Sequence, residues 1–316
     1  MVLVNRRRRS PPIEGRRVLI TGGSSGIGLA CARELTAGGA RIVLLARGEE
    51  GLRQAAASLD PAPATLSADV TDPAAMRAAL AAAAELLGGL DVVIANAAAA
   101  AYGPFGAMSV DDYRRTIDVA LLGNLNTTHA ALSHLQRTAG TLVVVGSIAG
   151  RVPTPWLAAY TAAKHGLRGF VRSLTAELRA LGSPVKVALI APGPVDTPFW
   201  ARARTVDRRL PPRLYGVYKP EDVAREVTRA IGSPRTERTV GGLMAAFALV
   251  DAIAPNATLR VLGPLARPGW RKRDSRPFEP SDALTEPAAE AKLHTGSLPN
   301  RPSVLVRLRD LARIGR

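Results

Sequence analysis

The sequence predicts a three-layer, doubly wound α/β fold with a mainly parallel seven-stranded sheet. From residue 17 onward, short apolar runs alternate with longer segments whose apolar residues recur at helical spacing. This alternation is typical of repeated β-α units, which bury a parallel sheet between two layers of helices. The predicted strands are Val18–Ile20, Arg41–Leu45, Ala64–Ala68, Val92–Ala95, Thr141–Val145, Val185–Ile190 and Thr239–Val240. The predicted helices are Ile27–Ala37, Glu50–Ser58, Ala74–Leu87, Val110–Leu135, Ala158–Leu181 and Pro220–Ile231.

Three regions are predicted along the 316 residues, a length that suits one large domain with extra segments. Residues 1–14 form a basic N-terminal arm, residues 15–262 the α/β domain, and residues 263–316 a Pro- and Arg-rich C-terminal tail. The tail is expected to be largely disordered because its composition buries little apolar area. Within it, residues 303–316 have the pattern of a short basic amphipathic helix. Residues 196–218 lack clear periodicity and are expected to form a mobile lid.

The formal net charge of +16 is concentrated at the two ends of the chain. Residues 1–17 hold six arginines and one acid, and residues 260–316 hold twelve basic and six acidic residues. The folded domain therefore lacks the excess of positive charge that is typical of a nucleic-acid-binding groove, and we expect no nucleic-acid partner. The basic ends are solvated tails in the simpler interpretation, and in the alternative they touch an anionic membrane surface.

Cysteine content and apolar runs indicate the compartment. Cys31 is the sole cysteine, so no internal disulfide can form and a reducing environment is the default. The N-terminus has no apolar run of a secretory signal, and Val240–Val250 is too short to span a bilayer. We expect a cytoplasmic protein, with peripheral contact at the inner face of the membrane as the alternative.

A glycine-rich turn follows the first predicted strand, in Thr21-Gly22-Gly23-Ser24-Ser25-Gly26-Ile27-Gly28, and a helix begins at once. Such a turn lets a pyrophosphate approach bare backbone, while the helix presents unpaired N–H groups and its positive dipole end. Glycine turns also occur for purely structural reasons, but the strand before and the helix after favour a nucleotide. The residues expected to contact it are Gly22, Ser24, Ser25, Ile27 and Gly28.

The spacing Thr-Gly-x-x-x-Gly-x-Gly resembles the short-chain dehydrogenase/reductase family, whose members are oxidoreductases with a Rossmann fold. The resemblance covers about residues 15–262. NAD enzymes of that family carry an acid at the end of the second strand, whereas Ala46 stands here and Arg47 follows. A guanidinium suits a 2′-phosphate, so the resemblance implies NADP(H). The alternative interpretation makes Arg47 an exposed loop charge.

The resemblance implies further cofactor contacts after the later strands. Asp69 and Val70 resemble an adenine-contacting pair, with a helix N-cap region as the alternative. Asn96 stands in Ala95-Asn96-Ala97-Ala98, where the family has Asn-Asn-Ala-Gly. The segment after the sixth strand resembles one that lies beside the nicotinamide; its expected contacts are Pro192, Gly193, Val195 and Thr197.

A catalytic group is predicted from Ser147 at the end of the fifth strand and from Tyr160 and Lys164, which share one helical face. A lysine ammonium near the phenol would lower the pKa of Tyr160, so that Tyr160 serves as general acid or base. Ser147 would polarise the substrate oxygen. The resemblance implies that Tyr160 and Lys164 also contact the cofactor. Singly, each residue has a structural explanation, but the joint spacing favours the catalytic one.

One position departs from the family pattern. Many members carry an asparagine that holds a water near the lysine, and the corresponding residue here is Ala120. Asn124 and Asn126 lie about a helical turn or more away, so neither is expected to replace it. This departure supports an alternative function, a nucleotide-binding sensor or scaffold with weak catalysis.

The sequence as a whole predicts an NADP(H)-dependent oxidoreductase that moves hydride between the nicotinamide and a carbonyl or secondary alcohol. Trp156 and the pair Phe199-Trp200 either line an apolar substrate site or pack the lid. The four histidines show no metal-ligand spacing, so no metal is expected. The family resemblance implies a homodimer or homotetramer packed through residues 110–135 and 158–181. Residues 240–242 and 254–255 resemble an uncharacterised bacterial branch with long C-terminal extensions.

Overall fold

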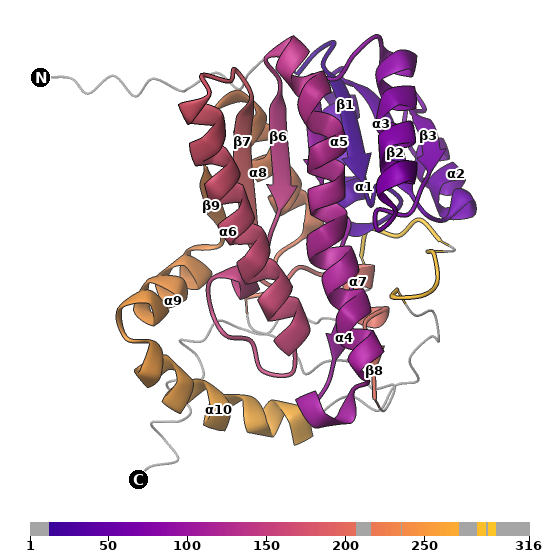
Figure 1. Cartoon of the computed structure of the whole chain (residues 1–316). Helices are drawn as coiled ribbons and strands as arrows, with labels where there is room; N and C mark the ends of the chain where they lie inside the picture. Colours follow the sequence, from indigo (N-terminus) through magenta and orange to yellow (C-terminus); the bar gives the residue numbers. More distant parts are fainter. Residues whose placement is uncertain (1–12, 207–215, 235, 272–282, 289, 295–316) are drawn as a thin grey trace, which may run out of the picture.

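Seven strands form one sheet in which every neighbouring pair is parallel, in the order β3-β2-β1-β4-β6-β7-β9 (Figure 1). The structure is a computed structural model that describes residues 13–206, 216–234, 236–271, 283–288 and 290–294. The strands are β1 (Arg17–Thr21), β2 (Arg41–Ala46), β3 (Ala64–Ser67), β4 (Val92–Ala95), β6 (Thr141–Val145), β7 (Lys186–Pro192) and β9 (Glu237–Val240). The predicted fold class is confirmed.

Helices cover both faces of the sheet, as the alternating pattern predicts. The buried residues of α1 (Gly26–Ala37), α2 (Glu49–Ala57) and α8 (Pro220–Gly232) pack on one face. Those of α3 (Pro73–Leu87), α5 (Gly123–Thr138) and α6 (Ala158–Ala180) pack on the other. The remaining elements are α4 (Val110–Ile117), α7 (Pro198–Ala201), α9 (Gly242–Ile253), α10 (Pro255–Arg271), and the two-stranded sheet of β5 (Ala101–Tyr102) and β8 (Arg204–Thr205).

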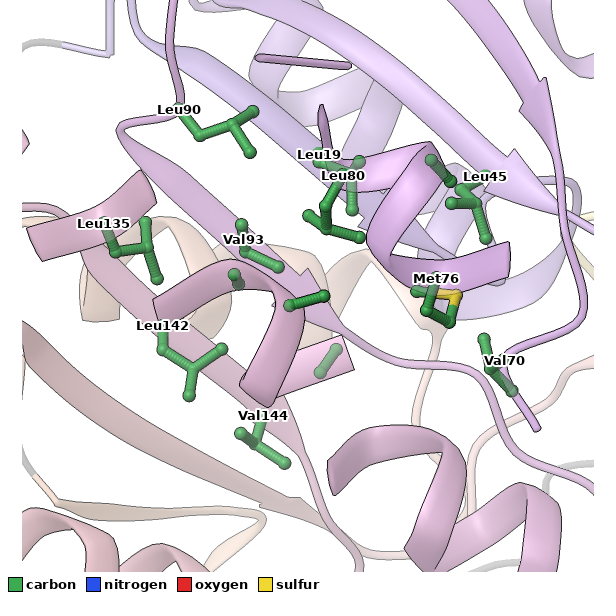
Figure 2. Packing of buried hydrophobic residues seen from close by; sticks show 14 of the residues in the cluster. Leu19, Leu45, Val70, Met76, Leu80, Leu90, Val93, Leu135, Leu142 and Val144 are labelled. Atoms are coloured by element: carbon green, nitrogen blue, oxygen red, sulfur yellow. The ribbon is translucent and has the colours of Figure 1, made fainter. Parts of the chain in front are cut away.

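Alternate residues of the central strands enter two different cores, because successive side chains of a strand point to opposite faces. Leu19 of β1 faces α3 and α5, whereas its neighbours Val18 and Ile20 face α1 and α8. Figure 2 shows the first of these cores, where Val93 and Leu142 of the sheet lie near Leu80, Met76 and Leu135 of the helices. Burial on both faces explains why these strands are continuous apolar runs in the sequence.

The predicted helix over residues 110–135 is divided in two. A turn of π-helix over Asp118–Leu122 separates α4 from α5. The Asn124 side chain donates to the carbonyl oxygen of Ala120 at 3.1 Å and to that of Ala97 at 3.2 Å, which ties this turn to the loop after β4. A π turn inserts a residue into the helical repeat, so apolar spacing alone does not reveal it.

The C-terminal region differs from the prediction. Helix α10 continues through residue 262, the expected end of the domain, and residues 283–288 and 290–294 lie against the domain near the carboxyl ends of β1 and β2 (Figure 1). These residues are placed against the domain, because Leu284 is 1% exposed and belongs to the core. Residues 1–12 of the arm, residues 207–215 of the lid and the basic helix over 303–316 lie outside the described residues.

Among the residues that the structure describes, no helix combines the length and the apolar character needed to span a bilayer.

We expect Leu80→Ala to lower the free energy of unfolding by about 2–5 kcal/mol, because it leaves a cavity beneath the sheet. The matched control is Leu86→Ala on the same helix, since Leu86 is 54% exposed. Chemical denaturation of both variants measures the difference, and an equal loss in the two would contradict the assignment of this core.

Candidate active site

The parallel register brings the ends of four strands to one edge of the sheet. Ile20 lies opposite Ile94, Ala95 opposite Val144, and Val145 opposite Ile190. The loops that follow β1, β4, β6 and β7 therefore leave the sheet side by side. Pro192 is the last residue of β7, and the other predicted site residues lie on these loops, on the loops after β2 and β3, or in the first two turns of the helices that follow them.

The glycine loop is packed as closely as the sequence predicts. A Cβ atom at Gly28 would lie 2.1 Å from the carbonyl oxygen of Gly22, so α1 can begin here only with a glycine. Gly22 itself has φ of +65°, and a Cβ there would lie 2.9 Å from the Asn96 amide nitrogen. That amide donates to the carbonyl oxygens of Thr21 at 3.0 Å and Gly22 at 3.3 Å. Asn96 thus holds the glycine loop against β4.

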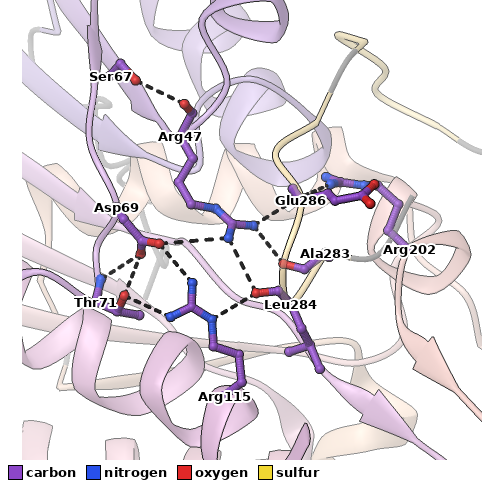
Figure 3. A network of polar contacts seen from close by, with 9 residues as sticks. All are labelled: Arg47, Ser67, Asp69, Thr71, Arg115, Arg202, Ala283, Leu284 and Glu286. Atoms are coloured by element: carbon purple, nitrogen blue, oxygen red, sulfur yellow. Dashed lines mark hydrogen bonds and ion pairs between the residues drawn. The ribbon is translucent and has the colours of Figure 1, made fainter. Parts of the chain in front are cut away.

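Two arginines surround Asp69 at the end of β3 (Figure 3). Arg115 of α4 donates to the Asp69 carboxylate at 2.9 Å, and an Arg47 nitrogen lies 3.9 Å from the same carboxylate. Thr71 adds donors from its backbone N–H at 2.9 Å and its hydroxyl at 2.8 Å. Burial by itself would raise the pKa of Asp69, but the hydrogen bonds from Thr71 and the charges of Arg115 and Arg47 outweigh it and lower that pKa.

Both arginines also bind the C-terminal segment. Arg47 donates to the carbonyl oxygens of Ala283 at 2.7 Å and Glu286 at 3.0 Å, and Arg115 donates to that of Leu284 at 2.9 Å. Figure 3 shows these carbonyl groups facing the two guanidinium groups. The predicted cofactor arginine is therefore half-buried and well supplied with acceptors, and the interpretation of Arg47 as an exposed loop charge is wrong.

The segment after β7 returns to the glycine loop. Thr197 is buried, and a Cβ atom at Gly26 would lie 3.1 Å from the Thr197 Cβ. Val195 bridges to Tyr218, and its carbonyl oxygen accepts from the Trp200 indole at 3.0 Å. Pro192 is the last residue of β7 and Gly193 follows it. This segment thus joins the phosphate end of the predicted cofactor site to the catalytic end.

The structure brings the predicted catalytic residues together. Tyr160 is 8% exposed and hydrogen-bonds the Ser147 side chain. The Lys164 ammonium donates to the carbonyl oxygen of Val145 at 3.0 Å and lies 5.6 Å from the centre of the Tyr160 ring. Ser147 also accepts from the backbone N–H of Ala149 at 3.1 Å, which fixes its side chain at the start of the next turn.

Burial controls the protonation of both Tyr160 and Lys164. Desolvation raises the pKa of Tyr160 to about 12, and the hydrogen bond with Ser147 offsets only part of that rise. Desolvation lowers the pKa of Lys164 to about 7. The predicted lowering of the Tyr160 pKa by Lys164 is not observed in the protein by itself, because these surroundings disfavour the charged form of each residue.

Aromatic rings cover the Tyr160 side chain. The Phe199 ring lies 5.3 Å from that of Tyr160, and the Trp200 ring lies 5.2 Å from that of Phe199 at an angle of 88°. Ala120 and Trp156 belong to the same apolar cluster, in which Ala120 is fully buried. An apolar surface therefore adjoins Tyr160, the predicted catalytic tyrosine.

The two asparagines near Ala120 have structural partners. The Asn124 amide is directed to Ala97 and Ala120, and that of Asn126 donates to the Val70 carbonyl oxygen at 3.0 Å. Asn126 thus anchors the turn that carries Asp69 and Val70. These contacts agree with the expectation that neither asparagine replaces the missing one.

Sequence reasoning missed Arg115 and the C-terminal segment. Arg115 lies 46 residues from Asp69, and Leu284 lies 169 residues from Arg115. The segment contributes mostly backbone carbonyl oxygens, which every sequence has and which therefore give no signal. The sequence predicts no contact for Thr21, the first residue of the glycine motif. In the structure its hydroxyl accepts from the backbone N–H groups of Asn96 and Ala97.

The residues present fit a dinucleotide. The loop around Gly22 and Gly28 leaves bare backbone, α1 directs its first N–H groups toward the same edge, and two guanidinium groups lie beyond β2 and β3. Phosphate groups bind well to such helix ends and guanidinium groups. Within the described ranges, no group of three or more His, Cys, Asp or Glu side chains is arranged to hold a metal ion.

The comparisons with known proteins identify the family of this chain. A family model described as short chain dehydrogenase matches residues 16–207. The chain is 32% identical over 251 residues to the uncharacterised oxidoreductase YxnA of Bacillus subtilis (strain 168), which covers 78% of this chain and 70% of that protein. It is 30% identical over 277 residues to dehydrogenase/reductase SDR family member 7B of Bos taurus, covering 82% and 83%. The chain belongs to the short-chain dehydrogenase/reductase family and is an oxidoreductase by family.

Solved structures share the fold. A short-chain dehydrogenase/reductase from Burkholderia phymatum in complex with NAD superposes with a TM-score of 0.70 at 23% identity, covering 78% of this chain and 96% of that one. An alcohol dehydrogenase from Thermococcus sibiricus complexed with 5-hydroxy-NADP superposes with a TM-score of 0.62 at 28% identity, covering 71% and 95%. Nucleotide-bound relatives thus include both an NAD and an NADP-type complex.

We expect the stability of the wild-type protein to rise with pH between about 7 and 10 through Lys164. In this window the unfolded chain keeps its lysine proton and the folded protein has released it, so the contribution to the free energy of unfolding increases by up to about 1.4 kcal/mol per pH unit. Denaturation at pH 7 and pH 9.5 measures it.

The variant Lys164→Met isolates the contribution of this lysine, because it should remove the part of the pH dependence of stability that Lys164 causes. Lys186→Met, at an exposed lysine, is the matched control and should retain it. An unchanged pH dependence in Lys164→Met would contradict the burial of an uncharged lysine. Both measurements stay below pH 10, where ionisation of the tyrosine in the unfolded chain begins to act in the opposite direction.

Proposed function

We propose that this protein is an NADP(H)-dependent oxidoreductase that reduces the carbonyl group of an apolar small molecule, or oxidises the corresponding secondary alcohol. The observation that carries the proposal is the joint placement of Ser147, Tyr160 and Lys164 at the carboxyl edge of the sheet, beside a glycine loop. A protein that only bound a nucleotide would have no need to bury a phenol and an amine together, since burial of both carries a free-energy cost.

The chain's own residues supply the proton chemistry. With a pKa of about 12, Tyr160 is a neutral phenol at physiological pH and can donate its proton to a carbonyl oxygen. Ser147 orients that oxygen and the Tyr160 hydroxyl by hydrogen bonding. Lys164, with a pKa of about 7, can return a proton to Tyr160 near neutral pH. When bound, the nicotinamide supplies or accepts the hydride.

Two arginines support the preference for NADP(H). No acid stands at the end of β2, where Ala46 is followed by Arg47. Arg115 and Arg47 both lie beside the Asp69 carboxylate. Paired guanidinium groups match the planar oxygen pairs and the charge of a 2′-phosphate. Gly22, Ser24, Ser25, Ile27 and Gly28 would hold the pyrophosphate, while Asp69 and Val70 would adjoin the adenine.

The apolar surface beside Tyr160 supports an apolar substrate. Phe199 contacts the Tyr160 ring directly, and Trp200 packs against Phe199. A ketone or aldehyde with an apolar body would bury its hydrocarbon part against these rings while its oxygen meets Ser147 and Tyr160. The NADPH-rich cytoplasm is the compartment that we propose for this reduction.

Purified protein should oxidise NADPH in the presence of at least one member of a panel of apolar ketones and aldehydes. Tyr160→Phe should lower kcat by roughly 10²–10⁴-fold, because it removes only the proton donor. The control is Tyr113→Phe, which removes a hydroxyl that donates to the Phe105 carbonyl oxygen outside the catalytic group. Full activity of Tyr160→Phe would defeat the proposed role.

Arg47→Leu should lower the ratio of NADPH affinity to NADH affinity by about tenfold or more, since a guanidinium–phosphate interaction is worth roughly 1.5–3 kcal/mol. Fluorescence titration with both nucleotides gives the two dissociation constants. Arg33→Leu, on the exposed side of α1, is the matched control. A wild-type protein that binds NADH as tightly as NADPH would refute the NADP(H) assignment.

Ala120 supports a second candidate function, a nucleotide-binding sensor or scaffold with weak catalysis. Ala120 is fully buried in the π turn, and the amides of Asn124 and Asn126 are directed elsewhere. A protein of this kind would bind NADPH at micromolar concentration yet show no NADPH oxidation across the carbonyl panel, whether or not Tyr160 is intact.

A further inference from the structure

A C-terminal segment lies over the groups that are expected to hold the phosphates of the cofactor. We call residues 283–288 and 290–294 the strap. The strap reaches from Arg202, whose carbonyl oxygen accepts from the Ala283 N–H at 2.9 Å, to the start of α1. Its placement at the carboxyl edge of the sheet brings a distant part of the chain onto the nucleotide-binding half of the site (Figure 1).

At one end, the carbonyl oxygens of the strap accept hydrogen bonds from the two arginines. Arg47 donates to the Ala283, Leu284 and Glu286 carbonyl oxygens at 2.7, 3.5 and 3.0 Å, and Arg115 donates to that of Leu284. Figure 3 shows the backbone carbonyl groups of Ala283, Leu284 and Glu286 around the Arg47 guanidinium. Carbonyl oxygens thus stand where a 2′-phosphate would place its own acceptors.

At the other end, the strap binds the helix terminus. The Gly26 N–H at the start of α1 donates to the Lys292 carbonyl oxygen at 2.8 Å. The carbonyl oxygen of Ala288 crosses Gly48 and Gly51 so closely that Cβ atoms there would lie 2.8 and 2.6 Å from it. Backbone approach of this kind over α2 leaves no space for a nucleotide between the strap and the loop after β2.

Side chains anchor the strap to the domain. Leu284 is buried and belongs to the core cluster on the face of the sheet that α3, α5 and α6 cover, and the Ala291 N–H donates to the Gln54 side chain at 3.2 Å. His294 lies 3.0 Å from a Glu221 carboxylate oxygen and 3.6 Å from one of Asp196. The strap is therefore held at both ends and in the middle.

We propose that the strap is an internal occupant of the phosphate-binding half of the cofactor site and that NADP(H) must displace it in order to bind. This inference rests on the proposed function, which supplies the nucleotide. A single N–H such as that of Gly26 donates one hydrogen bond, so it cannot serve the Lys292 carbonyl and a pyrophosphate oxygen together. A charged phosphate is the stronger acceptor for Arg47 and Arg115, which makes the displacement favourable at sufficient NADPH.

The size of the effect follows from the fraction of molecules with the strap released. If about 1–10% are open, the measured dissociation constant of NADPH is roughly 10–100-fold above that of the open site. Loss of the strap should lower that constant, and the KM for NADPH, by the same factor. The kcat at saturating NADPH should stay unchanged, because the cofactor has then displaced the strap.

The test compares NADPH dissociation constants by fluorescence titration in three proteins. These are the wild type, Leu284→Asp, which removes the buried anchor, and a chain that ends after Arg271. The matched control is Glu290→Gln, since Glu290 is exposed and its side chain pairs with Lys292 within the strap. We expect Leu284→Asp and the shortened chain to bind NADPH at least tenfold more tightly than the wild type, and Glu290→Gln to bind it as the wild type does.

Hydrogen exchange on the unmodified chain gives a second measurement that does not depend on the variants folding. Added NADPH should speed exchange at the N–H groups of Ala283 and Ala291, which hold the strap to Arg202 and Gln54. Equal dissociation constants in all forms, weaker binding without the strap, or slower exchange with NADPH would overturn the inference. Tight NADPH binding in these cases would leave the proposed function intact, whereas no binding in any form would overturn both.

Discussion

Parallel pairing of β1, β4, β6 and β7 is the constraint on which the site depends. It fixes the heights at which four loops leave the sheet, so that the glycine turn, Asn96, Ser147 and the segment after Pro192 meet at one edge. Strands buried on both faces hold this register, because a one-residue slip would move every side chain into the opposite core, where different helices pack against it. The predicted site residues are thus positioned by strands that are buried on both faces.

Burial gives the catalytic residues their proton affinities. Tyr160 and Lys164 lie in surroundings that favour their uncharged forms, so at neutral pH a phenol and a partly deprotonated amine stand within one apolar cluster. Tyr160 is oriented by its hydrogen bond with Ser147, and Lys164 by its hydrogen bond to the Val145 carbonyl oxygen. Neither bond cancels the effect of burial on the pKa of the residue. This arrangement suits proton donation to a carbonyl oxygen.

Arg47 and Arg115, at the predicted phosphate-binding end of the site, interact with two different kinds of acceptor. The Asp69 carboxylate forms an ion pair with Arg115, while the strap offers carbonyl oxygens that carry only partial charge. Partial charges are weaker acceptors than a phosphate, so the proposed displacement of the strap would exchange weaker acceptors of the Arg47 guanidinium group for a stronger one. The basic site is therefore kept hydrogen-bonded when no nucleotide is present.

The sequence by itself determined the main sheet, most of the helices and the motif residues, because short apolar runs, helical apolar spacing and the glycine turn are local in the chain. It could not reveal the π turn around Ala120, the partnership of Arg115 with Asp69 or the buried Leu284, since each depends on contacts between segments far apart. Only the tertiary structure decided that burial raises the pKa of Tyr160 and that backbone carbonyl oxygens cover Arg47. Desolvation and backbone hydrogen bonding arise from the surroundings of a residue, and the residue's own letter does not encode them.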